Sequence, residues 1–205
     1  MNDFDVILKK LPAVFEMAEA KVFMTKYASP AHKLSQLVEQ GRLLRLRRGL
    51  YAKLENFDHF LAANRLVSPS YVSFETALAH YGLIPERVEI VMSVTDRHAT
   101  RFKTAVGDFA FHEQTTDLFG SSYRIEAKAD YSIRIASPEK SLLDTLSRAR
   151  LRSDNLKAQD MRDYVRDSLR IDESELEKLS RRELRRIAPL YISRAVNLFV
   201  ESYKS

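Results

Sequence analysis

Residues Ser29–Lys53 read SPAHKLSQLVEQGRLLRLRRGLYAK, and the order of signals in this stretch is the most informative in the chain. Its first half predicts a short helix, because Ser29 suits an N-cap, Pro30 the first helical position and Gly41 the position just past the end. Its second half holds two β-leaning runs joined by Arg-Arg-Gly at positions 47–49. The stretch therefore predicts a capped helix followed by an arginine-rich hairpin.

The predicted helix has two unlike faces. Leu34, Leu37 and Val38 recur at helical spacing and predict a buried stripe, with Ala31 beside them. The opposite face is polar. A polar helix face that fits the major groove, followed by a cationic hairpin, is typical of a winged helix-turn-helix on duplex DNA. Base reading is expected from His32, Lys33 and Gln36, with Ser35 a weaker candidate, because Gln can pair with adenine and Lys can reach guanine acceptors.

Positive charge is concentrated in this part of the chain. Residues 21–53 hold eight Lys or Arg and one acid, whereas residues 56–205 hold 23 basic and 22 acidic side chains. A cluster of cations around a helix and a hairpin favours contact with phosphates. The expected backbone and wing contacts are Lys26, Tyr27, Ser29, Arg42, Arg45, Arg47 and Arg48. The apolar residues between them, Leu44, Leu46 and Leu50, are expected to form the core of the hairpin.

Composition limits the class of protein. The chain of 205 residues is 45% hydrophobic and 30% charged, which is typical of a globular protein. No apolar run is long enough for a membrane span, and Asp3 and Asp5 stand where a signal peptide would carry positive charge. Without cysteine there are no disulfides or thiol chemistry, and the five histidines lack metal-ligand spacing. We expect a cytoplasmic protein with no membrane contact, no cofactor and no metal.

The rest of the chain predicts an α+β protein in two parts. Residues 1–55 are expected to form the winged helix-turn-helix. A helical stretch over 1–20, which Pro12 should break or kink, and a short helix over 22–27 are expected before the recognition helix. Residues 56–205 are expected to form a second domain that mixes an antiparallel sheet over about 88–136 with helices over 137–203. Its strands are expected over 88–94, at 109–111, at 123–125 and over 131–135. Ser73 and Ser137 are expected to cap helices, and Pro189 to begin the last helix, with Ile192 in its buried stripe.

The chain resembles the AbiEi family of antitoxins and transcriptional regulators from type IV toxin–antitoxin (abortive infection) systems. The resemblance rests on Arg47–Tyr51, Tyr71–Leu78, Tyr81–Glu86 and Ala136–Asp144, which together span more than half of the chain. It implies an autorepressor without enzymatic activity that binds inverted repeats in its own promoter. It also implies that the second domain counteracts a nucleotidyltransferase toxin, without requiring a stable complex. We expect a monomer in solution that pairs on double-stranded DNA.

Two alternatives remain open. The first is a winged-helix regulator that has a sensory or protein-binding second domain and no toxin. The second is a metal-dependent nuclease, because Asp117, Glu126 and Lys128 match a D…ExK pattern, although Glu126 and Lys128 equally suit a solvent face with Ile125 buried opposite. His80 is expected in the core.

A second arginine cluster lies near the C-terminus. Four arginines at helical spacing could contact nucleic acid or an acidic partner surface, or form a solvated face balanced by nearby glutamates: Arg181, Arg182, Arg185 and Arg186.

Overall fold

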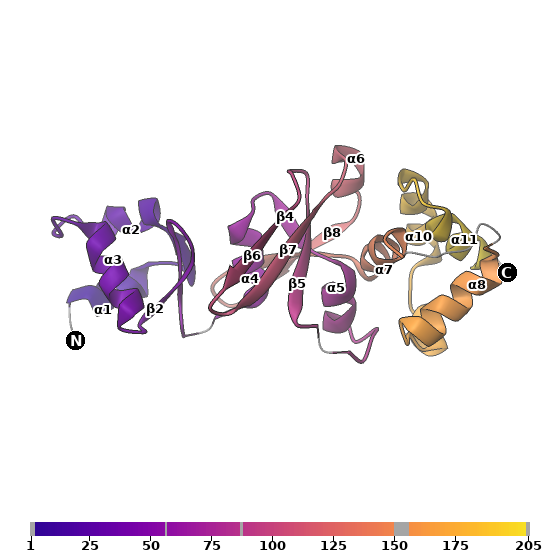
Figure 1. The fold of residues 1–205 in the computed structure, drawn as a ribbon, viewed down its shortest axis with the longest axis horizontal. Helices are drawn as coiled ribbons and strands as arrows, with labels where there is room; N and C mark the ends of the chain where they lie inside the picture. The colour runs from indigo at the N-terminus through magenta and orange to yellow at the C-terminus, as the bar shows by residue number, and fades with distance from the viewer. Residues whose placement is uncertain (1–2, 56, 87, 150–155, 204–205) are drawn as a thin grey trace.

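The structure, a computed structural model, describes residues 3–55, 57–86, 88–149 and 156–203. The molecule is elongated, with an N-terminal module at one end, a six-stranded sheet in the middle and a group of helices at the C-terminal end (Figure 1). Helices and two sheets alternate along the chain, which confirms the predicted α+β class. Among the described residues, no helix is long and apolar enough to cross a membrane.

The N-terminal module packs three helices against a small antiparallel sheet of order β1-β3-β2. Phe4, Phe15, Leu34, Leu37 and Leu43 are among the side chains that form its core, all at most 1% exposed. Its elements are α1 (Asp3–Lys10), β1 (Val14–Glu16), α2 (Met17–Phe23), α3 (Pro30–Glu39), β2 (Leu43–Arg47) and β3 (Leu50–Lys53).

The predicted helix and hairpin of this module are confirmed. Ser29 caps α3 by accepting a hydrogen bond from the backbone N–H of His32, and Gly41 follows the helix with a φ of +66°. Gly49 turns the chain between β2 and β3 with a φ of +81°, a conformation that suits glycine. Local signals were sufficient here because caps and turns act over only a few residues.

Two predictions for the first 27 residues were wrong. The helix expected over 1–20 is broken before Pro12, as predicted, but the chain beyond the break does not resume directly as a helix: Val14 and Phe15 form a buried strand paired with β3. A second helix was expected over 22–27, but α2 begins at Met17. The long-range pairing with β3 decides the strand, and a capping interaction between Glu16 and Glu19 decides where α2 starts.

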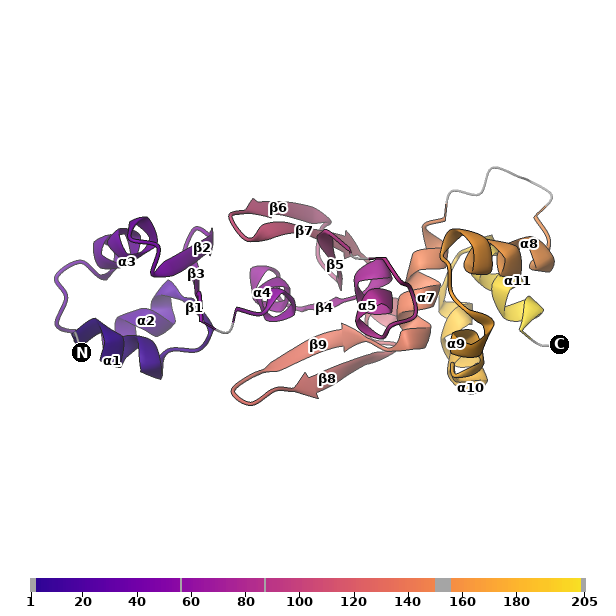
Figure 2. The same ribbon diagram turned by 90° about the horizontal axis from the view of Figure 1, so that it is seen from below.

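The central sheet has strand order β6-β7-β5-β4-β9-β8. The predicted antiparallel sheet is corrected to a mixed one, because β5/β7 and β4/β9 are parallel and only the other pairs are antiparallel. It curves around α4 and α5 (Figure 2). The sequence predicted β5, β7, β8 and β9 but missed β6 and the short β4, which follows a Ser-Pro break. The bounds are α4 (His59–Leu66), β4 (Ser70–Val72), α5 (Phe74–His80), β5 (Ile90–Thr95), β6 (Thr100–Thr104), β7 (Gly107–Glu113), α6 (Thr116–Phe119), β8 (Tyr123–Ala127) and β9 (Ser132–Ala136).

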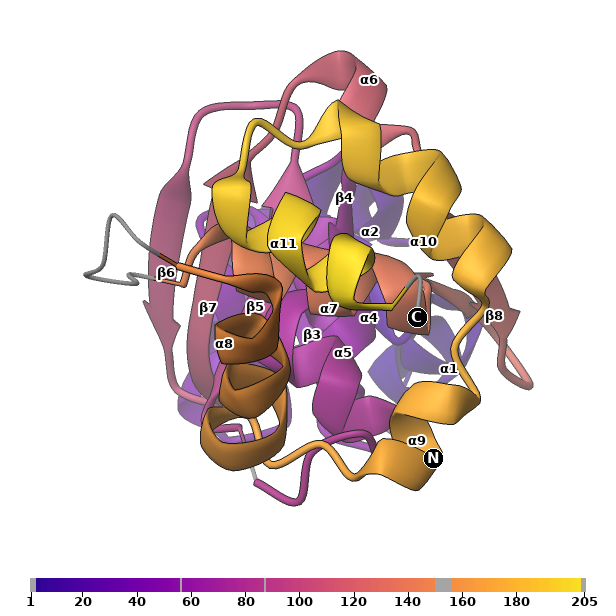
Figure 3. The same cartoon turned by 90° about the vertical axis from the view of Figure 1, so that its right-hand side faces the viewer.

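The C-terminal helices pack around α7, the helix that directly follows strand β9 of the central sheet (Figure 3). Ser137 caps α7 as predicted, by accepting from the backbone N–H of Lys140. The last helix begins at Arg194 and not at Pro189, and Ile192 is fully exposed, which corrects the predicted stripe. The reason is that Pro189 lies in a separate 3₁₀ turn and Ser193 caps the final helix. The remaining elements are α7 (Pro138–Ser147), α8 (Ala158–Asp163), a π-helical segment (Tyr164–Ser168), α9 (Glu173–Glu177), α10 (Arg181–Ile187), a 3₁₀ turn (Ala188–Leu190) and α11 (Arg194–Ser202).

The N-terminal module is also packed against α4. Val14, Leu46 and Leu50 share an apolar cluster with Leu61 of α4, which in turn lies on the central sheet. The predicted boundary at residue 55 therefore falls between two parts that bury side chains against each other.

Candidate nucleic-acid interface

Helix α3 presents the three predicted base-reading residues on its accessible side. His32 is exposed, while Lys33 and Gln36 are half-buried. His32 Nε2 lies 3.1 Å from Gln36 Nε2, as expected for side chains one turn apart. Leu34 and Leu37 are fully buried beneath them. Burial of one face and N-capping hold the polar face in place.

The residues just before α3 differ in exposure. Lys26 is exposed, whereas Tyr27 is half-buried and its ring packs edge-to-face on Phe4, with the ring centroids 6.3 Å apart. Tyr27 therefore anchors the loop between α2 and α3 to α1. Ser29 is occupied as the helix cap.

Two of the four predicted wing arginines are held by the protein itself. Arg42 forms an ion pair with Asp5 of α1. Arg47 donates to Glu16 Oε1 at 3.2 Å and to the backbone oxygen of Leu66 at 3.4 Å. These contacts join the hairpin to α1, β1 and the end of α4, and they occupy guanidinium groups that the sequence assigned to phosphates.

The other two arginines are directed to solvent. Arg45 on β2 and Arg48 in the turn are both exposed, and neither forms an ion pair with another described residue. Leu46 and Leu50 are buried and Leu44 is half-buried, as predicted for the core of the hairpin. An exposed guanidinium without a partner in the protein has all five donors available for phosphate oxygens.

The C-terminal arginines lie at the opposite end of the molecule from α3 (Figure 1). Arg186 is held by Glu183 and by the backbone oxygen of Ser121, and its hydrogen bond lowers the pKa of the Glu183 carboxyl to about 2. Arg181 lies over the ring of Tyr203, with its guanidinium carbon 5.3 Å from the centroid. Arg182 and Arg185 are exposed, so only half of this cluster is directed wholly to solvent.

The residues of the D…ExK pattern are distributed over two elements. Glu126 lies on β8, where its Oε2 is 3.3 Å from Nε2 of His80 and 3.6 Å from Nζ of Lys128, and Asp117 is exposed on α6. Two expectations were wrong: Ile125 is 66% exposed and His80 lies at the surface. The orientation of β8 that exposes Ile125 places Glu126 on the opposite face of the strand, toward His80 of α5. Among the described residues, no group of three His, Asp or Glu side chains is placed to hold a metal ion.

A fully buried ion pair on the inner face of α7 was not among the predicted sites. The side chains of Lys140 and Asp144 have no solvent exposure, and Nζ of Lys140 lies 2.5 Å from Oδ1 of Asp144. Asp144 also accepts hydrogen bonds from Ser73, Gln114 and Tyr191, each at 2.6 Å. Ser73 therefore donates to Asp144 and does not cap α5.

Burial shifts the pKa values of the groups in and around this ion pair. It lowers the pKa of Lys140, an effect that Asp144 opposes, and it raises the pKa of Tyr191 well above the ordinary value. A Lys and an Asp four residues apart inside an apolar helix stretch were the available signal.

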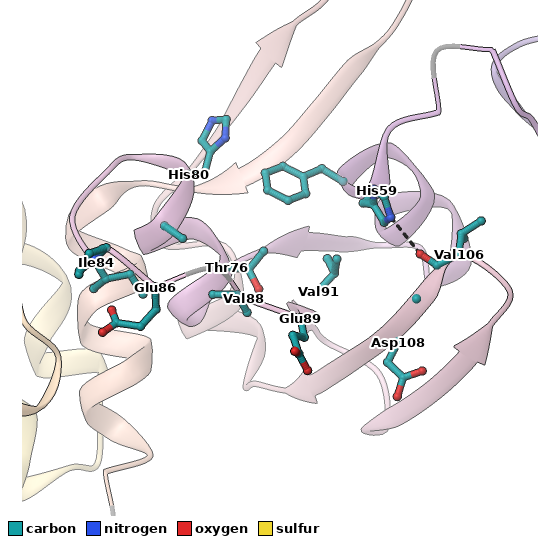
Figure 4. A pocket seen from close by; sticks show the side chains of 14 residues that line it. His59, Thr76, His80, Ile84, Glu86, Val88, Glu89, Val91, Val106 and Asp108 are labelled. Atoms are coloured by element: carbon teal, nitrogen blue, oxygen red, sulfur yellow. Dashed lines mark hydrogen bonds between the residues drawn. The ribbon is translucent and has the colours of Figure 1, made fainter.

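An open hollow lies between α4, α5, β5 and β7 and has a volume of about 800 Å³ (Figure 4). Ile84, Val88 and Val91 contribute apolar surface to it. His59 Nε2 lies 2.9 Å from the backbone oxygen of Val106 across one end. The charged and titratable side chains at its rim are His59, His80, Glu86, Glu89 and Asp108.

Comparison with known proteins supports the fold and nothing finer. No protein-family model matches the sequence, and no curated protein matches it either. The crystal structure of the RV2827C protein from Mycobacterium tuberculosis is similar, with a TM-score of 0.53 and 14% sequence identity over 98% of this chain and 79% of that chain. At this identity the similarity is one of fold alone. The arrangement of the two sheets and their helices therefore occurs in a second protein along almost the full length of this one.

Proposed function

We propose that residues 3–55 form a winged helix that binds double-stranded DNA through α3 and the β2–β3 hairpin. The order helix–strand–helix–helix–strand–strand and the sheet order β1-β3-β2 support this assignment. In such a fold α3 is the recognition helix and the hairpin is the wing. His32, Lys33 and Gln36 would then contact base edges.

The observation that carries the proposal is the pairing state of the wing arginines. Arg42 and Arg47 are neutralised by Asp5 and Glu16, whereas Arg45 and Arg48 are exposed without a carboxylate partner among the described residues. A protein gains nothing in stability from two unpaired cations on a five-residue strand and its turn, but a phosphate backbone would pair with both. Arg45 and Arg48 are therefore the proposed phosphate contacts.

The biological role that this DNA binding fits best is repression of the protein's own promoter in a type IV toxin–antitoxin system. This part of the proposal rests on the AbiEi-like motifs, of which Arg47–Tyr51 forms the end of the wing and Ala136–Asp144 contains the buried ion pair. The second domain would counteract a nucleotidyltransferase toxin. The open hollow beside α5 favours a second candidate, a regulator whose second domain binds a ligand and which has no toxin.

The first experiment is a gel-shift titration with the DNA immediately upstream of the gene, scrambled competitor DNA and a salt series. We expect two stepwise, sequence-specific shifts whose affinity falls steeply with salt, because two copies would occupy an inverted repeat. Equal binding to scrambled DNA would contradict sequence-specific repression.

A second experiment separates repression from antitoxin action. Arg45→Ala/Arg48→Ala in the full-length chain should lose repression of a promoter reporter and still protect cells from the toxin encoded beside it. A complete lack of protection by the wild-type chain would leave the regulator with a ligand-binding domain as the better candidate.

A further inference from the structure

The two outer strands of the central sheet carry different charge patterns, and one of them, β6, also contacts β2 of the N-terminal module. β6 and β8 are the outer strands, and within the described residues each has one neighbour, β7 and β9 respectively. They lie at opposite margins of the sheet (Figures 2 and 3). In an edge strand, alternate residues turn their backbone N–H and C=O groups away from the sheet, where another strand can pair with them.

The β6 edge opposes pairing with a copy of itself. Antiparallel pairing centred on Phe102 would place Arg101 of one chain opposite Lys103 of the other, and this contact would occur twice by symmetry. Both side chains are exposed and positive. Like charges directly opposite each other destabilise a strand pair, so β6 is protected against self-association.

The β8 edge has the opposite pattern. Antiparallel pairing centred on Ile125 would place Arg124 of one chain opposite Glu126 of the other, again twice by symmetry. Residues 124 and 126 share one face of the strand because side chains alternate. Glu126 is already held at this edge by His80 and Lys128, so its carboxylate is ordered before a second chain arrives.

The other face of β8 adds apolar surface at the same place. Ile125 is 66% exposed and Tyr123 is 41% exposed. In the centred register, Ile125 of one chain lies beside Ile125 of the other, and Tyr123 lies beside Ala127. Exposed apolar side chains of this size on an edge strand are otherwise a liability for a protein in water.

We propose that β8 is a homodimerisation edge, which pairs antiparallel with β8 of a second copy about a twofold axis at Ile125. The partner is a second copy because the sequence Arg-Ile-Glu at 124–126 is complementary to itself in the antiparallel direction, and the comparable Arg-Phe-Lys at 101–103 is not. A five-residue edge is small for a protein–protein interface, so the dimer is weak and forms at high protein concentration. The proposal does not depend on DNA binding.

The test is sedimentation velocity of the full-length protein without DNA, over a concentration series that reaches several hundred micromolar. The weight-average mass should rise from the 23.7 kDa of one chain toward twice that value. Ile125→Lys should abolish the rise, because two ammonium groups would meet at the axis. Ile192→Lys is the matched control, since Ile192 is a fully exposed isoleucine far along the chain from β8, and it should change nothing.

Charge reversal provides the sharper test. Arg124→Glu should raise the dimer Kd roughly fivefold to tenfold, because two attractive contacts become repulsive. The double change Arg124→Glu/Glu126→Arg should lower the Kd again relative to Arg124→Glu, although not fully to the wild-type value, because His80 and Lys128 no longer hold a carboxylate at position 126. Such a recovery also excludes misfolding as the cause of the single-variant effect. A wild-type chain that stays monomeric throughout, or a dimer that Arg124→Glu and Ile125→Lys leave unchanged, would overturn the proposal. A double variant that folds but pairs no better than Arg124→Glu would overturn it as well.

Discussion

Charged side chains in the N-terminal module and on the inner face of α7 have opposite environments. In the module, Arg45 and Arg48 are exposed and have no carboxylate partner among the described residues. On α7, Lys140 and Asp144 are completely buried, and Asp144 accepts four hydrogen bonds. A charge in water costs little to leave unpaired, whereas a charge in the interior must be fully satisfied.

The exposed cations and the buried ion pair therefore contribute to different properties, the first to binding and the second to stability. Exposed, unpaired cations add almost nothing to the stability of this chain, and their value depends on an external partner such as DNA. The buried pair links α7 to α5 through Ser73, to the end of β7 through Gln114 and to the C-terminal helices through Tyr191. Substitutions in the first group should change binding, and substitutions in the second should change folding.

The largest effect is expected for Asp144→Ala. It leaves the Lys140 ammonium buried without its counter-ion and removes the acceptor for three neutral side chains. Loss of one partner of a buried pair typically costs about 3–5 kcal/mol, and we expect a decrease of that order in the free energy of unfolding. Urea unfolding followed by circular dichroism would measure it.

Two controls sharpen this expectation. Asp167→Ala removes an exposed aspartate that pairs with Arg166 at the surface, and it should leave the unfolding midpoint nearly unchanged. Lys140→Met/Asp144→Leu removes both charges and should be less destabilising than Asp144→Ala alone. If the single variant is as stable as the wild type, the ion pair does not hold these elements together.

The next effect concerns the salt dependence of DNA binding. Arg45→Ala/Arg48→Ala should lower the slope of log Kobs against log salt by about 1 for each arginine lost, because each phosphate contact releases its counter-ions. Arg182→Ala/Arg185→Ala is the matched control, since it removes two exposed arginines from α10 at the other end of the molecule. Equal slopes for the two double variants would contradict a specific role for the wing.

A smaller effect is expected for base reading by α3. Gln36→Ala should weaken binding to the preferred site by about 1–3 kcal/mol and leave binding to random DNA nearly unchanged, because a bidentate contact discriminates only its own base pair. Competition gel shifts with the two DNAs would measure the difference. Equal losses on both DNAs would assign Gln36 to the phosphate backbone.

The smallest effect is a pH dependence of stability that involves His112. Burial, with Arg148 and Arg101 nearby, lowers the pKa of His112 from 6.5 to about 4. Between pH 6.5 and 4, His112 is therefore protonated in the unfolded chain and neutral in the folded chain. The free energy of unfolding should decrease as the pH falls through this window. The ring is partly exposed, so we expect a loss of roughly 1 kcal/mol after solvent screening.

Urea unfolding at pH 7, 6 and 5 would measure this loss. His112→Gln should reduce it, since glutamine does not titrate. The same loss in both proteins would show that other groups are responsible.

Local structure was predictable from the residues, and charge pairing was not. Ser29 and Ser137 cap the helices that their neighbours predicted, since a cap acts within one turn. Ser73 was predicted to cap α5 but donates to Asp144, 71 positions away. Strands β1 and β4 have only three residues each, and these two strands and β6 are defined by their partners in the sheets, so the sequence did not predict them.

The sequence by itself determined the α+β class, the helix α3, the arginine-rich hairpin and the concentration of positive charge around them. Only the tertiary structure decided which arginines of the hairpin remain available, because Asp5 lies 37 positions from Arg42 and Glu16 lies 31 positions from Arg47. It also decided that Lys140 is buried and that Ile125 is exposed at an edge. Caps, turns and helical periodicity depend on neighbours within a few residues, whereas burial and ion pairing depend on segments that only folding brings together.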